Sequence, residues 1–120
     1  MGIILFLLFT KHLIVDFFLQ TNWQASNKGT FGHPGGLVHS GLHGFATAGL
    51  FLALGASTWW LMGLVDAVSH YLIDWSKVNL TKKLGLTFKN PGYWWLLGID
   101  QYLHTIMYFV ILYLSLIINF

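Results

Sequence analysis

The sequence predicts an all-α fold: an integral membrane bundle of four transmembrane helices in up-down order, with residues 1–120 as a single transmembrane domain. The first reason is composition. Hydrophobic residues make up 56% of the chain and charged residues 8%, whereas about a quarter of the residues of a soluble domain are charged. The second reason is four long apolar stretches, each close to the roughly 20 residues that a helix needs to cross a bilayer. None alternates apolar and polar residues, so strands are not expected.

The predicted spans cover residues 3–20, 37–54, 58–75 and 94–118. The first begins without a basic segment or a small-residue cleavage site, which favours a retained span over a removed signal peptide. Polar connections rich in glycine, asparagine and lysine occupy residues 21–36 and 76–93. Only Gly55, Ala56 and Ser57 separate the second and third spans, so a tight turn between antiparallel helices is expected there.

Small residues in the second span predict a close contact with a neighbouring helix. They are Gly41, Gly44, Ala48 and Gly49. Small side chains are common where membrane helices approach one another closely.

Lysine placement predicts the orientation of the bundle. Five of the six lysines lie in or beside the two long connections. Both connections emerge on the same face of a four-span bundle, and the positive-inside rule makes that face cytoplasmic. Both chain termini are then expected outside.

Cysteine content and net charge narrow the chemistry and the partners. The chain has no cysteine, which excludes disulfides, thiolate metal sites and cysteine nucleophiles. The formal charge of +2 comes without a basic run interleaved with aromatic residues, so nucleic acid is not expected as a partner. Membrane lipid is the expected partner. A homodimer that completes or shields a site stays open for a chain of 120 residues.

Acidic residues and histidines are concentrated in the predicted spans. All four acidic residues and five of the six histidines lie there, and they recur every four residues along the chain. This spacing stacks neighbouring side chains on one face of a helix. The resulting polar stripes are expected to meet at one depth, in the cytoplasmic half of the bundle. We refer to the nine residues as the His/Asp set: His12, Asp16, His39, His43, Asp66, His70, Asp74, Asp100 and His104.

The His/Asp set predicts a divalent-metal site. An ionised Asp at the centre of a span costs roughly 2.5–3.5 kcal/mol on insertion scales, so several together need a compensating partner. Nitrogen and oxygen ligands without sulfur suit zinc first, with manganese and iron as further candidates, and nine ligands could serve two or three ions. A less specific alternative is that these side chains only hydrogen-bond across helices. The number of residues in register favours metal.

Four further polar residues lie beside the stripes: Gln20, Asn22, Lys77 and Gln101. They could bind an anionic substrate group or orient the metal ligands. For Lys77, an ordinary interfacial lysine that extends to the headgroups is an equal alternative. Lys11, one residue off the first stripe, either extends to the interface in the same way or pairs with an Asp.

Four motifs carry a family resemblance: Lys11-His12 with Asp16 and Gln20, the His39 and His43 pair, Asp66 with His70 and Asp74, and Asp100-Gln101 with His104. Together they resemble the bacterial and phage membrane family named domain of unknown function 3307, over nearly the whole chain. The resemblance implies a multi-pass protein of the bacterial inner (cytoplasmic) membrane, and it names no reaction. In spacing alone, the pattern is also similar to larger membrane-bound metal-dependent hydrolases of bacteria.

The leading functional hypothesis is a metal-dependent hydrolase at the cytoplasmic face, acting on a lipid or lipid-linked phosphoester. The His/Asp set forms the metal shell, and the catalytic carboxylates are sought among Asp16, Asp74 and Asp100, with one acting as general base. Gln20, Lys77 and Gln101 form the surrounding substrate or orienting shell.

Two other classes of function stay open. The first is a non-enzymatic structural or accessory membrane subunit whose helices are held together by metal, which closed coordination would favour. The second is an ion or proton conduit, because intramembrane Asp and His chains also mark relays. Clustering of the polar residues in one half of the bundle argues against a continuous path.

Overall fold

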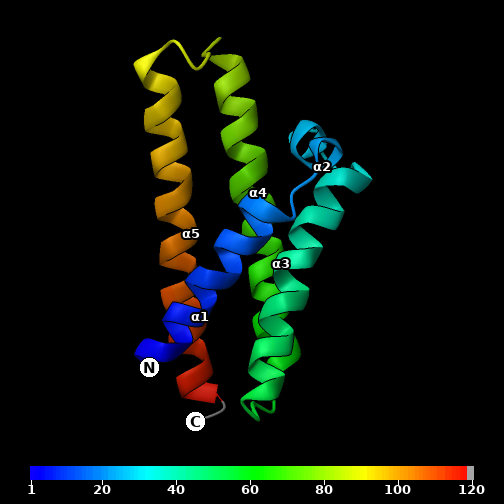
Figure 1. Ribbon diagram of the computed structural model, residues 1–120, viewed down its shortest axis with the longest axis vertical. Coiled ribbons are helices and arrows are strands. Elements are labelled where there is room, and N and C mark those ends of the chain that lie inside the picture. Colours follow the sequence, from blue (N-terminus) through cyan, green and yellow to red (C-terminus); the bar gives the residue numbers. More distant parts are fainter. Residues whose placement is uncertain (119–120) are drawn as a thin grey trace.

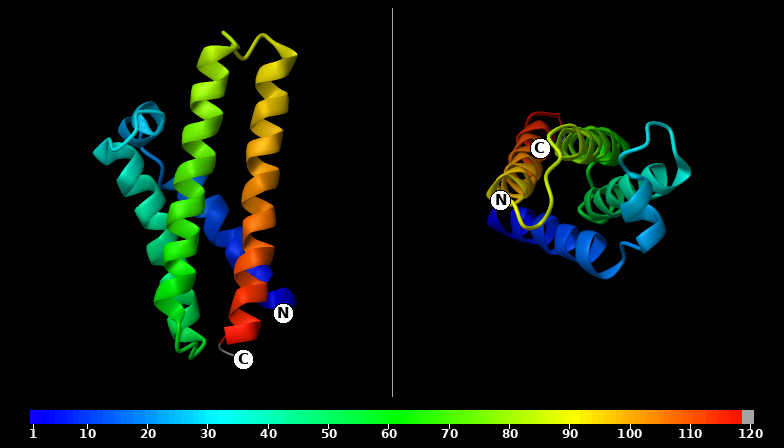
Figure 2. Two further views of the ribbon diagram at one scale, coloured as in Figure 1. Left: turned by 180° about the vertical axis from the view of Figure 1, so that it is seen from behind. Right: turned by 90° about the horizontal axis from the view of Figure 1, so that it is seen from above.

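The computed structural model describes residues 1–118, and these form five α-helices and one short π-helix. In chain order they are α1 (Gly2–Leu13), the π-helix η1 (Ile14–Phe18), α2 (Asn22–Asn27), α3 (Pro34–Ala53), α4 (Trp59–Lys83) and α5 (Pro91–Ile118). Helices α3, α4 and α5 run in alternating directions, and α1 crosses them obliquely (Figure 1). Seen along the long axis, the helices surround a common interior (Figure 2, right).

The all-α class is confirmed, but the prediction of four transmembrane helices is wrong. Among the described helices, α5 alone is long and apolar enough to cross a membrane. Helix α1 has 12 residues, well short of the roughly 20 that a span needs, and the remainder of the predicted span 3–20 includes the separate η1. Helices α3 and α4 have the length, but their polar residues lower the hydropathy below that of a span. The residues that form the polar stripes are thus among those that lower the hydropathy of α3 and α4.

The helix ends have local causes in the sequence. Thr21 caps α2, because its hydroxyl accepts a hydrogen bond from the Gln24 amide. His33 caps α3 in the same way: its Nδ1 accepts from the Gly35 amide at 3.0 Å. Pro34 then occupies the first turn, where its fixed φ suits a helix start. Gly55 ends α3 with a φ of 77°, a conformation that favours glycine.

Close packing of α3 on α4 depends on two glycines. A Cβ atom added at Gly44 would lie 2.6 Å from the Gly63 carbonyl oxygen, and one added at Gly63 would lie 2.7 Å from the Ala48 Cβ. Gly44 and Ala48 therefore serve the close helix contact that the sequence predicts. Gly41 and Gly49 do not, because an added Cβ at either would meet nothing within 4 Å.

The apolar core lies near the end of the molecule that holds the chain termini. Its buried members are Leu8, Phe51, Ala56, Met62, Tyr108 and Ile111. Beyond this layer, along the helices, the interior becomes polar. The π-helix η1 lies beside this polar part, and its wider turn, closed by the Leu19 amide on the Ile14 carbonyl at 2.9 Å, contains Asp16. Such turns occur often at functional sites.

Candidate metal centre

All nine residues of the His/Asp set are buried, with at most 9% of any of them exposed. They come from four directions, because α1 with η1, α3, α4 and α5 each contribute a stripe. Every-fourth-residue spacing therefore turns each stripe toward the same interior. The structure brings eight of the nine into three overlapping groups of possible metal ligands, which leave out Asp66.

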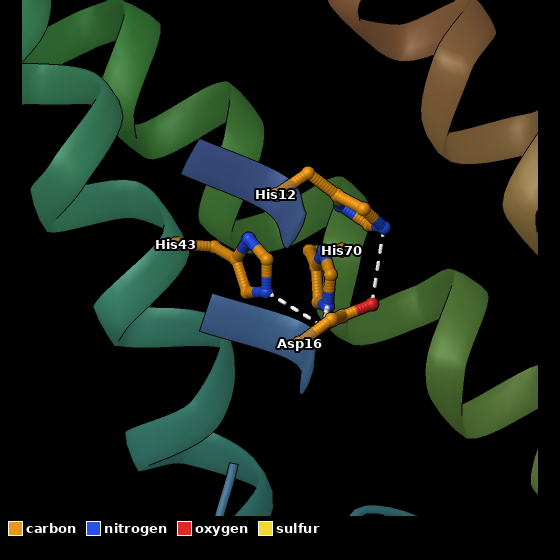
Figure 3. A group of neighbouring side chains, drawn as sticks. All are labelled: His12, Asp16, His43 and His70. Carbon is orange, nitrogen blue, oxygen red and sulfur yellow. Dashed lines mark hydrogen bonds and ion pairs between the residues drawn. The ribbon is translucent and has the colours of Figure 1, made fainter. Parts of the chain in front are cut away.

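The first group surrounds Asp16 and comprises His12, Asp16, His43 and His70 (Figure 3). Asp16 Oδ1 lies 2.8 Å from His43 Nε2 and 3.5 Å from His70 Nε2. The other carboxylate oxygen lies 3.1 Å from His12 Nε2. Three imidazoles from three helices thus point at one carboxylate.

The second group comprises His39, His70 and Asp74, and its ligand atoms form a nearly equilateral triangle. His39 Nε2 and His70 Nε2 are 3.2 Å apart. Asp74 Oδ2 lies 3.3 Å from the first and 3.2 Å from the second. This oxygen is buried and has no hydrogen-bond partner within residues 1–118. The Lys28 ammonium lies 3.4 Å from it, so a positively charged group faces this oxygen without donating a hydrogen bond to it.

The third group comprises Asp74, Asp100 and His104 and continues from the second, because Asp74 belongs to both. His104 Nε2 lies 3.3 Å from Asp74 Oδ1 and 3.6 Å from Asp100 Oδ1. Asp100 Oδ1 is also buried without a hydrogen-bond partner in the described part of the chain. The two oxygens of Asp74 therefore face different histidines, an arrangement in which one carboxylate can bridge two ions.

Asp66 is used differently from the other carboxylates. Its Oδ2 accepts a 2.6 Å hydrogen bond from Lys11 Nζ and another from the Thr47 hydroxyl. The Lys11 ammonium is also 3.1 Å from His43 Nδ1 and 3.1 Å from the Tyr108 hydroxyl. Asp66, predicted as a metal ligand, thus lies in an ion pair beside the metal-ligand groups.

The Lys11 ammonium determines which nitrogen of His43 carries a proton. An ammonium group can only donate, so it donates to His43 Nδ1. A neutral His43 must then carry its hydrogen on Nε2, which faces Asp16. In this state His43 orients Asp16. Outer partners that fix the tautomer and direction of such groups are common around metal sites.

Charge interactions keep the carboxylates ionised. Burial alone would raise the pKa of Asp16, but hydrogen bonds from surrounding histidines, including His12 and His39, hold that pKa well below its ordinary value. Burial and hydrogen bonding act on Asp74 in the same opposed way, and its pKa is also lowered. For His39, burial lowers the pKa, but the combined effect of the neighbouring Asp16 and Asp74 carboxylates outweighs it and raises the pKa. The two carboxylates therefore favour the protonated form of His39 when no metal is bound.

Of the four further polar residues, Gln20 and Gln101 contact members of the His/Asp set. Gln101 lies between two members of the set, with Oε1 3.1 Å from His12 Nε2 and Nε2 donating to Asp100 Oδ2 at 3.0 Å. Gln20 donates to the Asp16 carbonyl oxygen at 3.2 Å. Asn22 is exposed at the start of α2, and Lys77 lies in a groove beside Asp100.

Three residues at the centre were missed by sequence reasoning. Thr47 and Tyr108 extend the stripes of α3 and α5 by four more residues, so the spacing itself could have identified them. Lys28 follows α2 and places its Nζ 3.4 Å from Asp74 Oδ2 and 3.1 Å from Gln20 Oε1. No local pattern identifies Lys28, because the path of the chain after η1 brings it to the centre.

Direct hydrogen bonds cannot satisfy all the close contacts of His39. His39 Nε2 lies within 3.3 Å of Asp16 Oδ1, Asp74 Oδ2 and His70 Nε2. One imidazole nitrogen carries at most one hydrogen, so it can satisfy only one of these atoms. Two ligands bound tetrahedrally at zinc distances lie roughly 3.3 Å apart, close to the separations in the second group. The donor set and its spacing therefore suit zinc.

Fold and centre together define a small all-helical protein with a buried histidine and aspartate centre. The chain belongs to the family described as "Protein of unknown function (DUF3307)", whose model matches residues 4–120. The resemblance in the four motifs is thus confirmed at the level of the family. No curated protein and no solved structure matches the chain.

Proposed function

We propose that this protein binds divalent metal, zinc first, at His39, His70 and Asp74, and uses it to hydrolyse a phosphoester. The observation that carries the proposal is the triangle of their ligand atoms, with edges of 3.2, 3.2 and 3.3 Å. Three protein ligands leave a fourth position open for water or substrate, as in catalytic zinc sites. A bound ion of this kind lowers the pKa of a water to near 7 and polarises a phosphoryl oxygen.

A second ion position adjoins the first through Asp74. Asp74 Oδ1, Asp100 and His104 form its ligand group, and paired ions about 3.5–4 Å apart are frequent in phosphoester hydrolysis. Asp100 is the least engaged carboxylate of the ligand groups, because only Gln101 donates a hydrogen bond to it and its Oδ1 has no contact closer than the 3.6 Å ion pair with His104 among the described residues. We therefore assign Asp100 as the general base when the second position is empty. Asp16 holds the histidines in place.

We place this activity at a membrane, on a lipid or lipid-linked substrate. Helix α5 has the length and hydropathy of a span, and large apolar side chains such as Trp95 and Tyr102 are exposed along it. Exposed apolar surface of this kind marks a site of membrane or protein contact. The lysines near the connection between α4 and α5 favour the cytoplasmic side of a bacterial inner membrane for that end of the helix.

Phosphatase assays with matched variants test the hydrolase proposal. Purified protein loaded with zinc or manganese should hydrolyse p-nitrophenyl phosphate or its diester, and chelation should abolish turnover. Asp100→Asn should retain bound metal and lose about a hundredfold or more in kcat, the lower end of what a general base typically contributes. His33→Ala, which changes a helix cap away from the centre, is the control and should keep its activity. Metal-loaded wild type without turnover on either ester would remove the hydrolase assignment.

A structural role is the second candidate because Asp16 can close the coordination. Its Oδ1 lies 3.0 Å from His39 Nε2, so a small shift would supply a fourth protein ligand. Closed four-ligand sites stabilise folds and leave no position for substrate. Metal that raises the melting temperature without supporting turnover would favour this role.

A further inference from the structure

A groove between α4 and α5 leads to the candidate metal centre. It has a volume of about 260 Å³, close to the lower end of the range for small-molecule sites. Its walls are apolar because residues spaced by three and four turn one face of each helix toward the groove. The apolar wall residues are Leu72, Ile73, Leu80, Leu96, Ile99 and Leu103.

Asp100 joins the groove to the centre. It lines the groove and also belongs to the ligand group with Asp74 and His104. The residue is only 4% exposed, and its Oδ1 has no hydrogen-bond partner within residues 1–118. Asp100 therefore lies between the groove and the candidate centre, so a ligand head or its metal beside His104 would contact this carboxylate.

Other surface cavities lack this connection. Three further cavities of 330–370 Å³ are larger than the groove, and none is lined by a member of the His/Asp set. Size therefore does not distinguish the groove, whereas its chemistry does. It combines a carboxylate of the centre with the cationic side chain of Lys77.

We infer that the groove between α4 and α5 binds the hydrocarbon chain of a lipid whose phosphate head lies at the metal centre. This inference rests on the proposed function and names the substrate class as a phosphorylated amphiphile. Lys77 and the bound metal supply the positive charge that faces the head. Ile99 and Leu103 line the groove and are 53% and 41% exposed, so the groove opens on the apolar surface of α5, from which a lipid chain can enter.

A chain-length series tests the groove directly. The probes are inorganic phosphate and butyl, hexyl and octyl phosphate, titrated calorimetrically into metal-loaded full-length protein below the aggregation concentration of each probe. Burial of one methylene is worth up to about fourfold in affinity. Octyl phosphate should therefore bind at least roughly tenfold tighter than butyl phosphate, even if only part of the chain is buried.

Two variants from opposite walls fill the groove, and a third serves as control. Leu96→Trp on α5 and Leu80→Trp on α4 should each lower octyl phosphate affinity at least about tenfold while metal content and inorganic phosphate binding stay unchanged. Leu64→Trp places the same change in a cavity that shares only Leu72 with the groove and is lined by no member of the His/Asp set, and it should bind octyl phosphate like wild type. Using two positions keeps the test valid if one variant fails to fold.

Failure of the groove is distinguishable from failure of the hydrolase. After chelation, the affinity gain per methylene should persist, because it arises from the groove, while affinity for the phosphate head falls. Affinity that is flat across the series would overturn the inference, as would equal losses in all three variants, which indicate adsorption to general apolar surface. A dimer that dissociates in Leu96→Trp with unchanged octyl phosphate binding would show that a second copy covers the groove, and would also overturn it.

Discussion

Lys11 Nζ lies 2.6 Å from Asp66 Oδ2 in the interior, with 9% and 2% of the two side chains exposed. The pair links α1 to α4, two helices that are far apart in sequence. Burial lowers the pKa of Lys11, opposed by the nearby Asp66 charge. Burial would raise the pKa of Asp66, but the Lys11 charge and the hydrogen bonds from Lys11 and Thr47 together outweigh it and lower that pKa. Each charge therefore depends on the other to remain in the interior.

Removal of the ammonium should be strongly destabilising. Lys11→Met leaves an uncompensated carboxylate in the interior, and breaking a buried pair in this way typically costs about 3–5 kcal/mol. The double variant Lys11→Met with Asp66→Asn should recover much of that loss, because both charges are then absent. Urea unfolding followed by circular dichroism measures the difference. Equal stability of the single and double variants would show that the pair is not coupled.

Substitution of the two kinds of glycine in α3 should have opposite effects. Gly44→Ala forces a methyl group against the Gly63 carbonyl and should destabilise the protein by about 1–3 kcal/mol. Gly49→Ala meets no neighbouring atom within 4 Å and should stabilise it by up to about 1 kcal/mol through helix propensity. Thermal unfolding of both variants beside wild type checks the sign. A Gly44→Ala variant as stable as wild type would mean that α3 and α4 are not in close contact at Gly44.

Metal binding should strengthen as pH rises. The raised pKa of His39 means that this imidazole holds a proton to a higher pH than usual when no metal is bound. Metal must displace that proton, so affinity should rise by about tenfold per pH unit for each proton displaced. The rise should level off once the pH exceeds the raised pKa of His39. Zinc competition titrations between pH 6 and pH 8.5 measure the slope, and His33→Ala should show the same slope as wild type. A flat profile would exclude His39 from the ligands.

Four-residue spacing predicted which side chains share a helix face at the centre, but it did not predict how the helices are arranged. Because side chains at this spacing share a helix face, His39 and His43, or Asp100 and His104, had to point the same way in any helical packing. This holds with or without a membrane, so the set converges although the four-span bundle is wrong. The metal role of these residues stays a prediction.

The fold could not be read from apolar stretches alone. A run of 18 residues at positions 3–20 looks continuous, yet it contains α1, the π-helix η1 and the bend at Leu19 before α2. The spacing also predicts the same role, that of metal ligand, for Asp66 and Asp74, since both lie on the same stripe of α4. Only tertiary packing separates them, because Lys11 of α1 reaches one and Lys28 reaches the other.

Metal content of the Asp66→Asn and Asp74→Asn variants tests the central claim most directly. Both changes neutralise one buried carboxylate on α4, but only Asp74 belongs to the ligand groups. Elemental analysis of purified protein after equilibration with zinc should find stoichiometric metal in wild type and in Asp66→Asn, and little in folded Asp74→Asn. Folded wild type without zinc, or Asp74→Asn with as much zinc as wild type, would contradict the account of a metal centre at His39, His70 and Asp74.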